Sequence, residues 1–466
     1  MMLSNFFTKD FLSSQGVNDT NVVDICIDNR NVVPGSIFVA IKGVKHDGHD
    51  FVAAAIESGA IIVVVSKDMG YENLQIKVDD TTKALGEMAN CFKKSRSCNV
   101  IAVTGSCGKT STKNILAAIL QQQDSTLASA GNLNNLYGLP LSMFRLTTEH
   151  KYAVFELGAS VRGEIKKLTN ILQPDVALIT NAGESHQSGM GGNVAAVAAE
   201  KGEIFSTLTN EGVAVLNCDS PFFNYWLNLI SGKKWLGFTL DKTKHLEYNN
   251  LASLYGGFVF LADNINTSKL CYSFDIISKK FSYTIKTKLL GKHNVSNILA
   301  AVVIASYYGV EHSLIIKAVA ALTNSSRRNV MHEFDDICLI DDSYNANPQS
   351  FTAAINTLSL LTGSKVLVMG DMAELGEESI SLHKKISVYA KQSGIDMLLC
   401  FGEHSSYAAS SFGEGSYCFN SHQDIYNFII SQLNDKVNIL VKGSRSMSMD
   451  KVVDKLLCFL EEKSVV

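Results

Sequence analysis

The chain has 466 residues, of which 46% are hydrophobic and 18% are charged. This length predicts two to four domains, because domains usually contain about 100 to 200 residues, and the composition excludes a disordered chain. The net charge is only -4 and no long Lys/Arg run occurs, which excludes the basic surface that nucleic-acid binding requires. A small, discrete ligand is the expected partner.

The sequence shows no pattern for export or for a membrane span. Lys9 and Asp10 interrupt the segment in which a signal peptide needs an unbroken apolar core. Apolar stretches such as residues 60–65 and 299–305 fall short of the roughly 18 residues that cross a bilayer. The ten cysteines are scattered without a C-x-x-C pair, as expected of reduced thiols in a cytosol. We therefore expect a cytoplasmic protein.

The first part of the chain, residues 1–82, predicts a small α/β module. Residues 36–41 and 60–66 have the apolar pattern of strands, and residues 51–58 between them have the pattern of a helix.

A longer α/β pattern follows from residue 99. Apolar, β-rich runs predict buried strands at residues 100–104, 152–157, 175–180 and 213–217. Helical patterns at about residues 110–123 and 194–209 separate some of these runs, which predicts βαβ units on a parallel sheet. A β-rich insert is expected at roughly residues 235–290, and a helical stretch begins at His293. This central domain is predicted to span residues 83–312.

The alternation restarts in the last third of the chain, which predicts a further domain at residues 313–466. Each of its apolar runs is followed by a helical pattern, and the runs lie at residues 337–341, 365–370, 397–401 and 437–442. This arrangement is typical of a second doubly wound sheet.

The segment VIAVTGSCGKTSTKNILAAIL carries the sharpest functional signal. It runs from an apolar strand through a loop into an amphipathic helix, and the loop contains Gly105, Ser106, Cys107, Gly108, Lys109, Thr110 and Ser111. In a phosphate-binding loop, glycines let backbone N–H groups approach the phosphates, and the helix N-terminus favours anions. Lys109 would hold the β- and γ-phosphates, while Thr110 would supply a hydroxyl to Mg²⁺. The loop is shorter than G-x-x-x-x-G-K-[ST], because Val103 occupies the first glycine position.

The predicted fold class is therefore α/β with three domains. A small N-terminal α/β module precedes a central P-loop-type parallel-sheet ATPase domain, and a C-terminal Rossmann-like α/β domain completes the chain. ATP and Mg²⁺ are the expected cofactors. An ordinary glycine turn is the alternative interpretation of the loop.

Two polar residues follow predicted strands at the edge where open α/β sheets bind ligands. Glu156 lies at the end of the strand in YAVFEL, and His186 is the last residue of VALITNAGESH. With Thr110 they form a possible ligand set for Mg²⁺, which takes few protein ligands. Each is otherwise a surface residue. The residue pattern alone predicts that Lys201, in AAEKGEIF, is a solvated helical lysine.

Eight segments, in order along the chain, resemble motifs of the Mur ligases. They are TGSCGKTSTK, GNLNNLYGLPLSMFRL, FELGAS, EKGEIF, GKHNVSNILAA, DDSYNANP, GDMAELGEES and KGSRSM. The N-terminal segment CIDNRNVVPGSIFVAIKGVKHDGHDF resembles the family's module for a uridine nucleotide, so the resemblance covers nearly the whole chain.

The resemblance implies an ATP-dependent ligase of peptidoglycan precursor synthesis. The closest similarity is to the branch of the family that joins D-alanyl-D-alanine to UDP-MurNAc-tripeptide. ATP would phosphorylate the terminal carboxylate of the tripeptide, and the amine of D-alanyl-D-alanine would then attack the acyl phosphate. The main task of the protein would be charge neutralisation and positioning. A monomer is expected.

The resemblance also assigns roles to individual residues. Lys109, His186 and Lys201 match catalytic positions, and Thr110, Glu156, His186 and Lys201 match metal-site positions, with Lys201 as the lysine that the family carbamylates. Nucleotide contacts are implied for the loop residues 105–111 and for Asn294, Arg327 and Asp342. Substrate contacts are implied for Asp28, Asn29, Arg30, Lys42, Asp47, Gly48, His49, Asn345, Asn347 and Arg445.

Two positions depart from the family pattern. The N-terminal motif commonly reads D-S-R, and here Asn29 replaces the serine between Asp28 and Arg30. The arginine motif offers both Arg327 and Arg328, and the spacing to Val330 favours Arg327.

Three alternatives stay open from the sequence. The chain could be a Mur ligase for another amino acid or a related folate polyglutamylating enzyme, although DDSYNANP and GDMAELGEES favour the D-alanyl-D-alanine branch. It could also be a P-loop phosphotransferase or NTPase switch, or an inactive nucleotide-sugar binding module. The third residue of the peptide, lysine or diaminopimelate, is not encoded in any recognisable pattern.

Cys107 lies within the phosphate loop, close to a helix N-terminus. Such a position can lower a thiol pKa and raise its reactivity, which predicts inactivation by alkylation and protection by MgATP. The alternative is an inert Cys107 that faces the protein.

Overall fold

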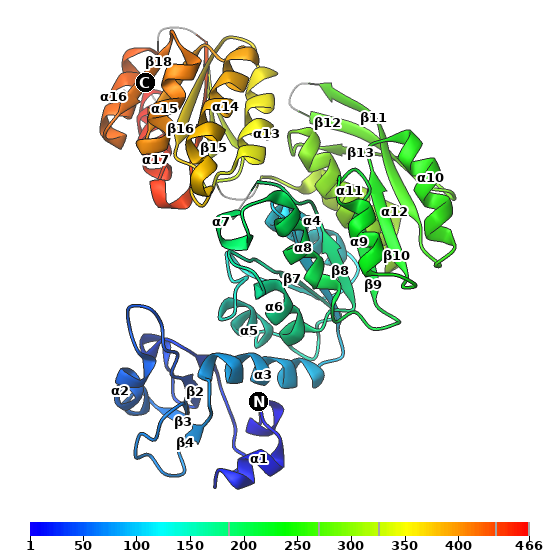
Figure 1. Ribbon diagram of the computed structural model, residues 1–466, viewed down its shortest axis with the longest axis vertical. Coiled ribbons are helices and arrows are strands. Elements are labelled where there is room, and N and C mark those ends of the chain that lie inside the picture. The colour runs from blue at the N-terminus through cyan, green and yellow to red at the C-terminus, as the bar shows by residue number, and fades with distance from the viewer. Residues whose placement is uncertain (185–186, 269–270, 325–326, 434–435, 465–466) are drawn as a thin grey trace.

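The computed structural model describes residues 1–184, 187–268, 271–324, 327–433 and 436–464. Three α/β domains follow one another along the long axis of the molecule, each built on its own sheet (Figure 1). The predicted fold class is confirmed. No helix in these described ranges is long and apolar enough to cross a membrane.

The N-terminal domain contains a parallel sheet with the strand order β1-β2-β3-β4. Its strands are β1 (Ile25–Cys26), β2 (Ser36–Val39), β3 (Ala60–Val65) and β4 (Gln75–Lys77). Its short helices are α1 (Lys9–Ser14) and α2 (Val52–Glu57). The strands β2 and β3 and the helix α2 confirm the predicted pattern for this part of the chain.

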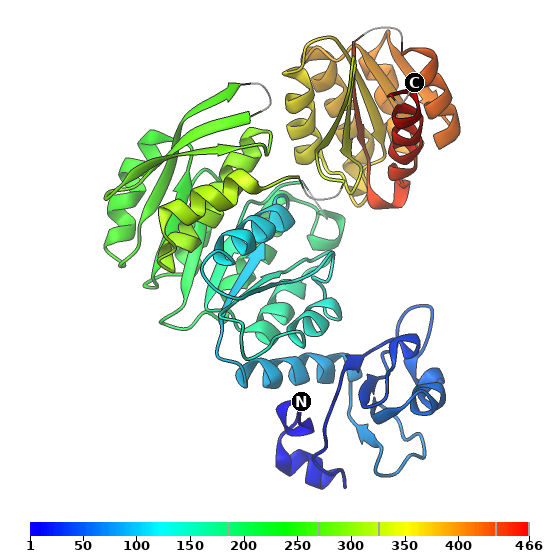
Figure 2. The same cartoon turned by 180° about the vertical axis from the view of Figure 1, so that it is seen from behind.

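Helix α3 (Thr81–Lys94) joins the N-terminal and central domains, and it lies between them in both views (Figures 1 and 2). Phe92 of α3 stacks on Phe6, with ring centroids 5.1 Å apart, and meets Phe144 of the central domain edge-on at 5.8 Å. Both domains therefore share one apolar core. The predicted boundary after residue 82 falls inside α3 and stays a prediction.

The central domain is built on a sheet with the strand order β13-β12-β11-β10-β9-β8-β5-β7-β6. The strands from β6 to β11 run parallel, whereas β12 and β13 pair antiparallel. The strands are β5 (Asn99–Thr104), β6 (Thr126–Ala128), β7 (Tyr152–Glu156), β8 (Val176–Ile179), β9 (Val213–Asn217), β10 (Trp235–Thr239), β11 (Val259–Ser268), β12 (Cys271–Ile277) and β13 (Ser282–Thr287). The segment expected as a β-rich insert supplies β10 to β13, but these strands extend the central sheet instead of forming a separate unit.

Helices cover both faces of this sheet, because its central strands are apolar on both sides. Helices α4 and α11 contribute to the core on one face, and α5, α6 and α8 to the core on the other. The helices of this domain and its C-terminal flank are α4 (Lys109–Leu120), α5 (Gly138–Met143), α6 (Glu164–Leu172), α7 (Gln187–Met190), α8 (Val194–Gly202), α9 (Phe223–Leu229), α10 (Lys242–Ser253), α11 (Lys292–Tyr307) and α12 (His312–Ala321). Helix α12 begins at the predicted boundary and packs against α4 and β13; the boundary after residue 312 stays a prediction.

The strand order reverses at β5, which lies between β7 and β8. The chain leaves β5 towards β6 and β7 on one side, and continues to β8 and β9 on the other. Such a topological switch point opens a crevice at the carboxyl ends of the strands. The loop of residues 105–108 starts at this point.

The C-terminal domain has a six-stranded sheet with the order β14-β15-β19-β16-β17-β18 within the described chain, and only β14 pairs antiparallel. Its strands are β14 (Val330–Phe334), β15 (Ile337–Asp342), β16 (Ser364–Gly370), β17 (Met397–Phe401), β18 (Ser416–Phe419) and β19 (Val437–Lys442). Its helices are α13 (Pro348–Ser359), α14 (Ser379–Gln392), α15 (Glu403–Phe412), α16 (His422–Ser431) and α17 (Asp450–Ser464). Apolar cores on both faces make this sheet doubly wound, as predicted.

Candidate active site

A cavity of about 540 Å³ lies between the central and C-terminal domains. The central domain lines it with residues 106–111 of the phosphate loop, with the loop around Asn134 and with Glu156. The C-terminal domain adds Arg328, Asp342 and Lys442. The cavity thus joins the switch point of the central sheet to the carboxyl ends of β15 and β19.

The phosphate loop is fixed by two glycines that approach neighbouring polar groups. Gly105 has a φ of 152°, and a Cβ there would lie 1.9 Å from the Thr180 hydroxyl. Gly108 has a φ of 82°, and a Cβ there would lie 2.4 Å from Oδ1 of Asn297. Larger residues would force the loop away from β8 and α11. The glycine spacing in the sequence therefore reflects close packing of the loop.

Hydrogen bonds hold this loop against the end of β8. The N–H groups of Ser106 and Cys107 donate to the main-chain and side-chain oxygens of Asn181, at 3.1 and 2.9 Å. The Lys109 ammonium donates to the Gly105 carbonyl at 2.7 Å. Because Lys109 begins α4, its charge adds to the positive end of the helix dipole. The loop can therefore attract a phosphate group.

Thr110 and Glu156 form an oxygen-rich corner of the cavity. The Thr110 hydroxyl donates to Oε2 of Glu156 at 2.6 Å, and the Asn134 side-chain amide donates to Oε1 at 2.8 Å. Glu156 is the last residue of β7 and is buried. A hydroxyl and a carboxylate fit Mg²⁺, which prefers oxygen ligands and keeps several waters. His186, the third sequence candidate, lies outside the described residues.

Lys201, on α8, is only 1% exposed. The prediction of a solvated lysine, which the residue pattern alone gave, is wrong, because the last turn of α8 is packed inside the central domain. The pKa of Lys201 is lowered to about 7, mainly by burial and then by the Lys109 ammonium, although Glu200 and Cys107 act in the opposite direction. A neutral amine is therefore accessible near neutral pH.

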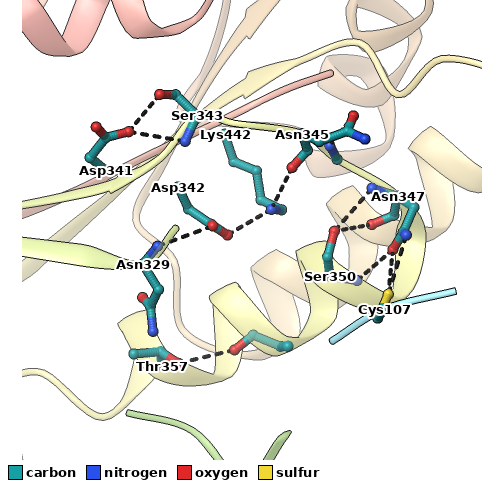
Figure 3. Close-up of polar contacts among 12 residues, drawn as sticks. Cys107, Asn329, Asp341, Asp342, Ser343, Asn345, Asn347, Ser350, Thr357 and Lys442 are labelled. Atoms are coloured by element: carbon teal, nitrogen blue, oxygen red, sulfur yellow. Dashed lines mark hydrogen bonds and ion pairs between the residues drawn. The ribbon is translucent and has the colours of Figure 1, made fainter. Parts of the chain in front are cut away.

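Cys107 is half-buried beneath the C-terminal domain. Its thiol is hydrogen-bonded to the Asn347 side chain, with Sγ 3.3 Å from Oδ1 and 3.2 Å from Nδ2 (Figure 3). Burial raises the pKa of the Cys107 thiol, and this outweighs the lowering effects of Asn347 and Lys109. The expected low pKa is wrong, because desolvation disfavours the thiolate more than the Asn347 hydrogen bond and the nearby lysines favour it.

Asp342 and Lys442 form an ion pair at the carboxyl ends of β15 and β19. The Lys442 ammonium lies 2.6 Å from Oδ2 of Asp342 and donates to the Asn345 carbonyl at 2.9 Å (Figure 3). Oδ1 of Asp342 accepts from the Asn329 N–H at 3.1 Å. Asp342, predicted as a nucleotide contact, thus lines the cavity with its carboxylate held in place.

The two candidate arginines are placed differently. Arg328 lines the cavity and stacks over the Tyr344 ring, 4.1 Å from its centroid. Arg327, the residue favoured by spacing, directs its guanidinium to α17, where it pairs with Asp454 at 3.1 Å and with Asp450 at 3.8 Å. The structure brings Arg328, and not Arg327, to the cavity.

The GKHN segment supplies a further wall. Asn294 lines the cavity and is held by two bonds, donating to the Leu290 carbonyl at 2.8 Å and accepting from Asn297 at 3.2 Å. His293 also lines the cavity.

The remaining candidates of the C-terminal domain also reach this cavity. Asn345 and Asn347 lie in the loop after β15, and Asn347 caps α13 by accepting from the Ser350 N–H at 2.8 Å. Arg445 follows β19 and pairs with Asp450 at 2.9 Å.

The N-terminal candidates lie apart from the cavity, after the carboxyl ends of the adjacent parallel strands β1 and β2. Asp28 pairs with Arg30 at 2.6 Å, and Asn29 lies between them. Asp47 accepts from the His49 ring at 2.6 Å, whose other nitrogen accepts from the Ser66 N–H at 2.9 Å. The backbones of Lys42 and Asp47 pair across the turn of residues 43–46, and the N–H of Gly48, which follows this turn, donates to the Ile41 carbonyl at 2.8 Å. One sheet edge therefore gathers all seven predicted residues.

Sequence reasoning missed Asn134 and Lys442 as site residues, and of the two candidate arginines it preferred Arg327 to Arg328, which lines the cavity. Asn134 lies in GNLNNLYG and Lys442 in KGSRSM, so both motifs were recognised without these members. Lys442 is the last residue of β19 and Asn134 lies in the loop between β6 and α5, so their position near the carboxyl ends of strands was the available signal. Only the folded structure shows which side chains of the loops enter the cavity.

Family models match most of the chain. The model described as the Mur ligase family catalytic domain matches residues 21–93, the Mur ligase middle domain matches residues 103–305, and the Mur ligase glutamate ligase domain matches residues 326–445.

Similar proteins were found along the full chain. The UDP-N-acetylmuramoyl-tripeptide--D-alanyl-D-alanine ligase of Escherichia coli is 36% identical to this chain, and the similar region covers 94% of each protein. The enzyme of the same name from Bacillus subtilis is 30% identical over 96% of both. A crystal structure of MurF from Acinetobacter baumannii superposes with a TM-score of 0.85 and 30% identity, over 93% of each chain.

Proposed function

This chain belongs to the Mur ligase family, and we propose that it joins D-alanyl-D-alanine to UDP-N-acetylmuramoyl-tripeptide with the consumption of ATP. The product is the UDP-linked pentapeptide precursor of peptidoglycan. One observation carries the proposal: a phosphate loop and the ion pair of Asp342 and Lys442, from two domains, line one cavity. The names of the relatives from Escherichia coli and Bacillus subtilis describe this ligation.

The chemistry requires an activated carboxylate. A carboxylate oxygen of the tripeptide attacks the γ-phosphorus of ATP, the bond from that phosphorus to the β,γ-bridging oxygen breaks, and ADP leaves. The amine of D-alanyl-D-alanine then attacks the acyl carbon, phosphate leaves, and the amine loses a proton. Exclusion of water protects the acyl phosphate between the two steps.

The central domain supplies charge stabilisation for the first step. In the bound state Lys109 exchanges its contact with the Gly105 carbonyl for the transferring phosphate, and the N-terminus of α4 faces the same group. Thr110 and Glu156 would hold Mg²⁺, which neutralises phosphate charge. Asn294, Asp342 and Arg328 bind the rest of the nucleotide, with Arg328 replacing the sequence choice of Arg327.

Lys201 acts as a carbamate in this proposal. Its burial and its lowered pKa favour the neutral amine that carbon dioxide requires. The carbamate would be an anion that positions a metal ion. Lys201→Ala is expected to be nearly inactive and to recover partly with acetate. An unmodified Lys201 in a fully active, metal-bound crystal would refute the modification.

The N-terminal domain is proposed to bind the uridine nucleotide. Its candidate residues, Asp28 to Arg30 and Lys42 to His49, share one sheet edge. We also propose that the protein is a cytoplasmic monomer. Light scattering is expected to give a mass near 50.7 kDa, and a mass twice as large would contradict the monomer.

The decisive activity test is the release of ADP. It should require both the UDP-linked tripeptide and D-alanyl-D-alanine. ADP release with a different amino acid in place of the dipeptide would indicate another branch of the family. Release without any amine acceptor would indicate a phosphotransferase or NTPase, and binding without release would indicate an inactive nucleotide-sugar module.

A further inference from the structure

Lys113 is a buried cation to which the proposed reaction assigns no role. It lies on α4, three residues after Thr110, and is only 2% exposed. Its ammonium donates to the main-chain carbonyl of Ser129, the residue that follows the edge strand β6. Burial of a lysine is costly and has to be compensated by specific contacts.

Ser129 connects this contact to Glu156. Its hydroxyl accepts from the Glu156 N–H at 3.1 Å, and its own N–H donates to the Val154 carbonyl at 3.0 Å. Ser129 is therefore bound to β7 on both sides of Phe155, while its carbonyl is bound to α4. A shift of Ser129 would move the end of β7.

The loop that starts at Ser129 returns to the same carboxylate. Asn134 donates to Oε1 of Glu156 at 2.8 Å, and its carbonyl accepts from the Gly158 N–H at 2.9 Å. Thr110 holds the other oxygen, Oε2, at 2.6 Å. Glu156 is thus fixed from two sides. Thr110 of α4 binds one oxygen directly, and the other oxygen is bound by the loop that begins at Ser129, which Lys113 holds against α4.

We propose that Lys113 is a positioning residue for the metal site. By holding Ser129 against α4, Lys113 sets the distance between the Thr110 hydroxyl and the Glu156 carboxylate. This deepens the proposed function and rests on it. Residues that orient a ligand in this way typically change metal affinity by about 10- to 100-fold when they are lost.

The test measures metal binding with ADP present, and follows Mn²⁺ by electron paramagnetic resonance. Lys113→Met keeps most of the side-chain volume but removes the donor. We expect its dissociation constant for Mn²⁺ to rise by about 10-fold or more, and the half-saturating Mg²⁺ concentration in the ADP-release assay to rise in parallel. Lys113→Arg, which keeps the charge and a donor, should recover part of the affinity.

Lys233→Met is the matched control, because Lys233 likewise donates to a main-chain carbonyl, that of Leu208, in the same domain. It should leave Mn²⁺ affinity unchanged. If Lys113→Met does not fold, Ser129→Ala, which removes the acceptor of the Glu156 N–H, should raise the Mn²⁺ dissociation constant in its place.

Unchanged Mn²⁺ affinity in the folded Lys113→Met or Ser129→Ala protein would overturn the inference. Equal losses in Lys113→Met and Lys233→Met would do the same. The binding measurement uses only ADP and metal, so a wrong choice of peptide substrate would leave its result intact.

Discussion

Buried lysines mark the proposed site at the scale of single residues. Lys113, Lys201 and Lys442 are each no more than 2% exposed, although lysine is rarely buried without a specific partner. Lys442 pairs with Asp342, Lys113 binds the Ser129 carbonyl, and Lys201 has a lowered pKa. Lys442 therefore keeps a compensated charge at the cavity, whereas Lys201 is proposed to react as a neutral amine.

Lys109→Ala is expected to reduce kcat by about 10²- to 10⁴-fold, or roughly 3 to 5 kcal/mol of barrier, through loss of charge stabilisation at the transferring phosphate. Lys109 contacts the loop through one hydrogen bond to the Gly105 carbonyl, so the fold should survive. The ADP-release assay and circular dichroism provide the measurements. Near wild-type ligation by a folded variant would contradict the assigned role.

The adjacent arginines offer a matched pair. Arg328→Ala should raise the KM for ATP by about 10-fold, which corresponds to about 1.4 kcal/mol, because Arg328 lines the cavity. Arg327→Ala should lower the melting temperature by loosening the contact with α17, and should change the KM for ATP less. The opposite ranking of the two KM values would restore Arg327 as the nucleotide contact.

At the scale of elements, the sequence predicts the buried strands well. The ranges 213–217, 397–401 and 437–442 coincide with β9, β17 and β19, because parallel strands covered on both faces are continuous apolar runs. The edge strand β18 was missed, since the sequence SYCF has no such run and is partly exposed. The loop contacts of Lys442 and Asn134 depend on tertiary packing, which no local pattern encodes.

Helix α14 contains a histidine whose neutral form the structure requires. Nε2 of His383 accepts from the Met372 N–H at 2.9 Å, while Nδ1 donates to the Ser379 carbonyl at 2.7 Å. Burial lowers the pKa of His383, and His404 adds to this, although Ser379 and Asp371 act in the opposite direction. These contacts fix the loop that carries GDMAELGEES.

The free energy of unfolding should therefore decrease at acidic pH. The unfolded chain binds more protons at this site below a pH of about 6.5, so the unfolding free energy decreases as the pH drops through that value towards the lower pKa of the folded state. Urea denaturation at pH 7 and pH 5 measures the effect. His383→Gln, which keeps an acceptor and a donor, should show a smaller decrease than the wild type; an equal decrease would contradict the assignment.

At the scale of the whole molecule, the proposed site is divided between two domains. Contacts between them already exist on one side of the cavity, where Cys107 meets Asn347 and the Ser188 hydroxyl donates to the Glu374 carbonyl at 3.5 Å. The N-terminal and central domains share one core through α3. The C-terminal domain is therefore the part that we expect to move.

A ligand that touches both domains favours the closed arrangement by its differential affinity. MgATP with the UDP-linked tripeptide should decrease the radius of gyration in small-angle X-ray scattering. Arg328→Ala should reduce this compaction while uridine-nucleotide binding to the N-terminal domain stays intact. An unchanged scattering curve with saturating ligands would argue against domain closure.

The central claim is that the tripeptide carboxylate is activated by phosphoryl transfer in the interdomain cavity. It is tested most directly with a tripeptide substrate whose terminal carboxylate carries ¹⁸O in both positions. If the attacking oxygen stays with phosphorus when the amine expels phosphate, each turnover transfers one ¹⁸O to the released phosphate, which mass spectrometry detects. Phosphate that contains no ¹⁸O after ligation would contradict the acyl phosphate and, with it, the proposed role of the cavity.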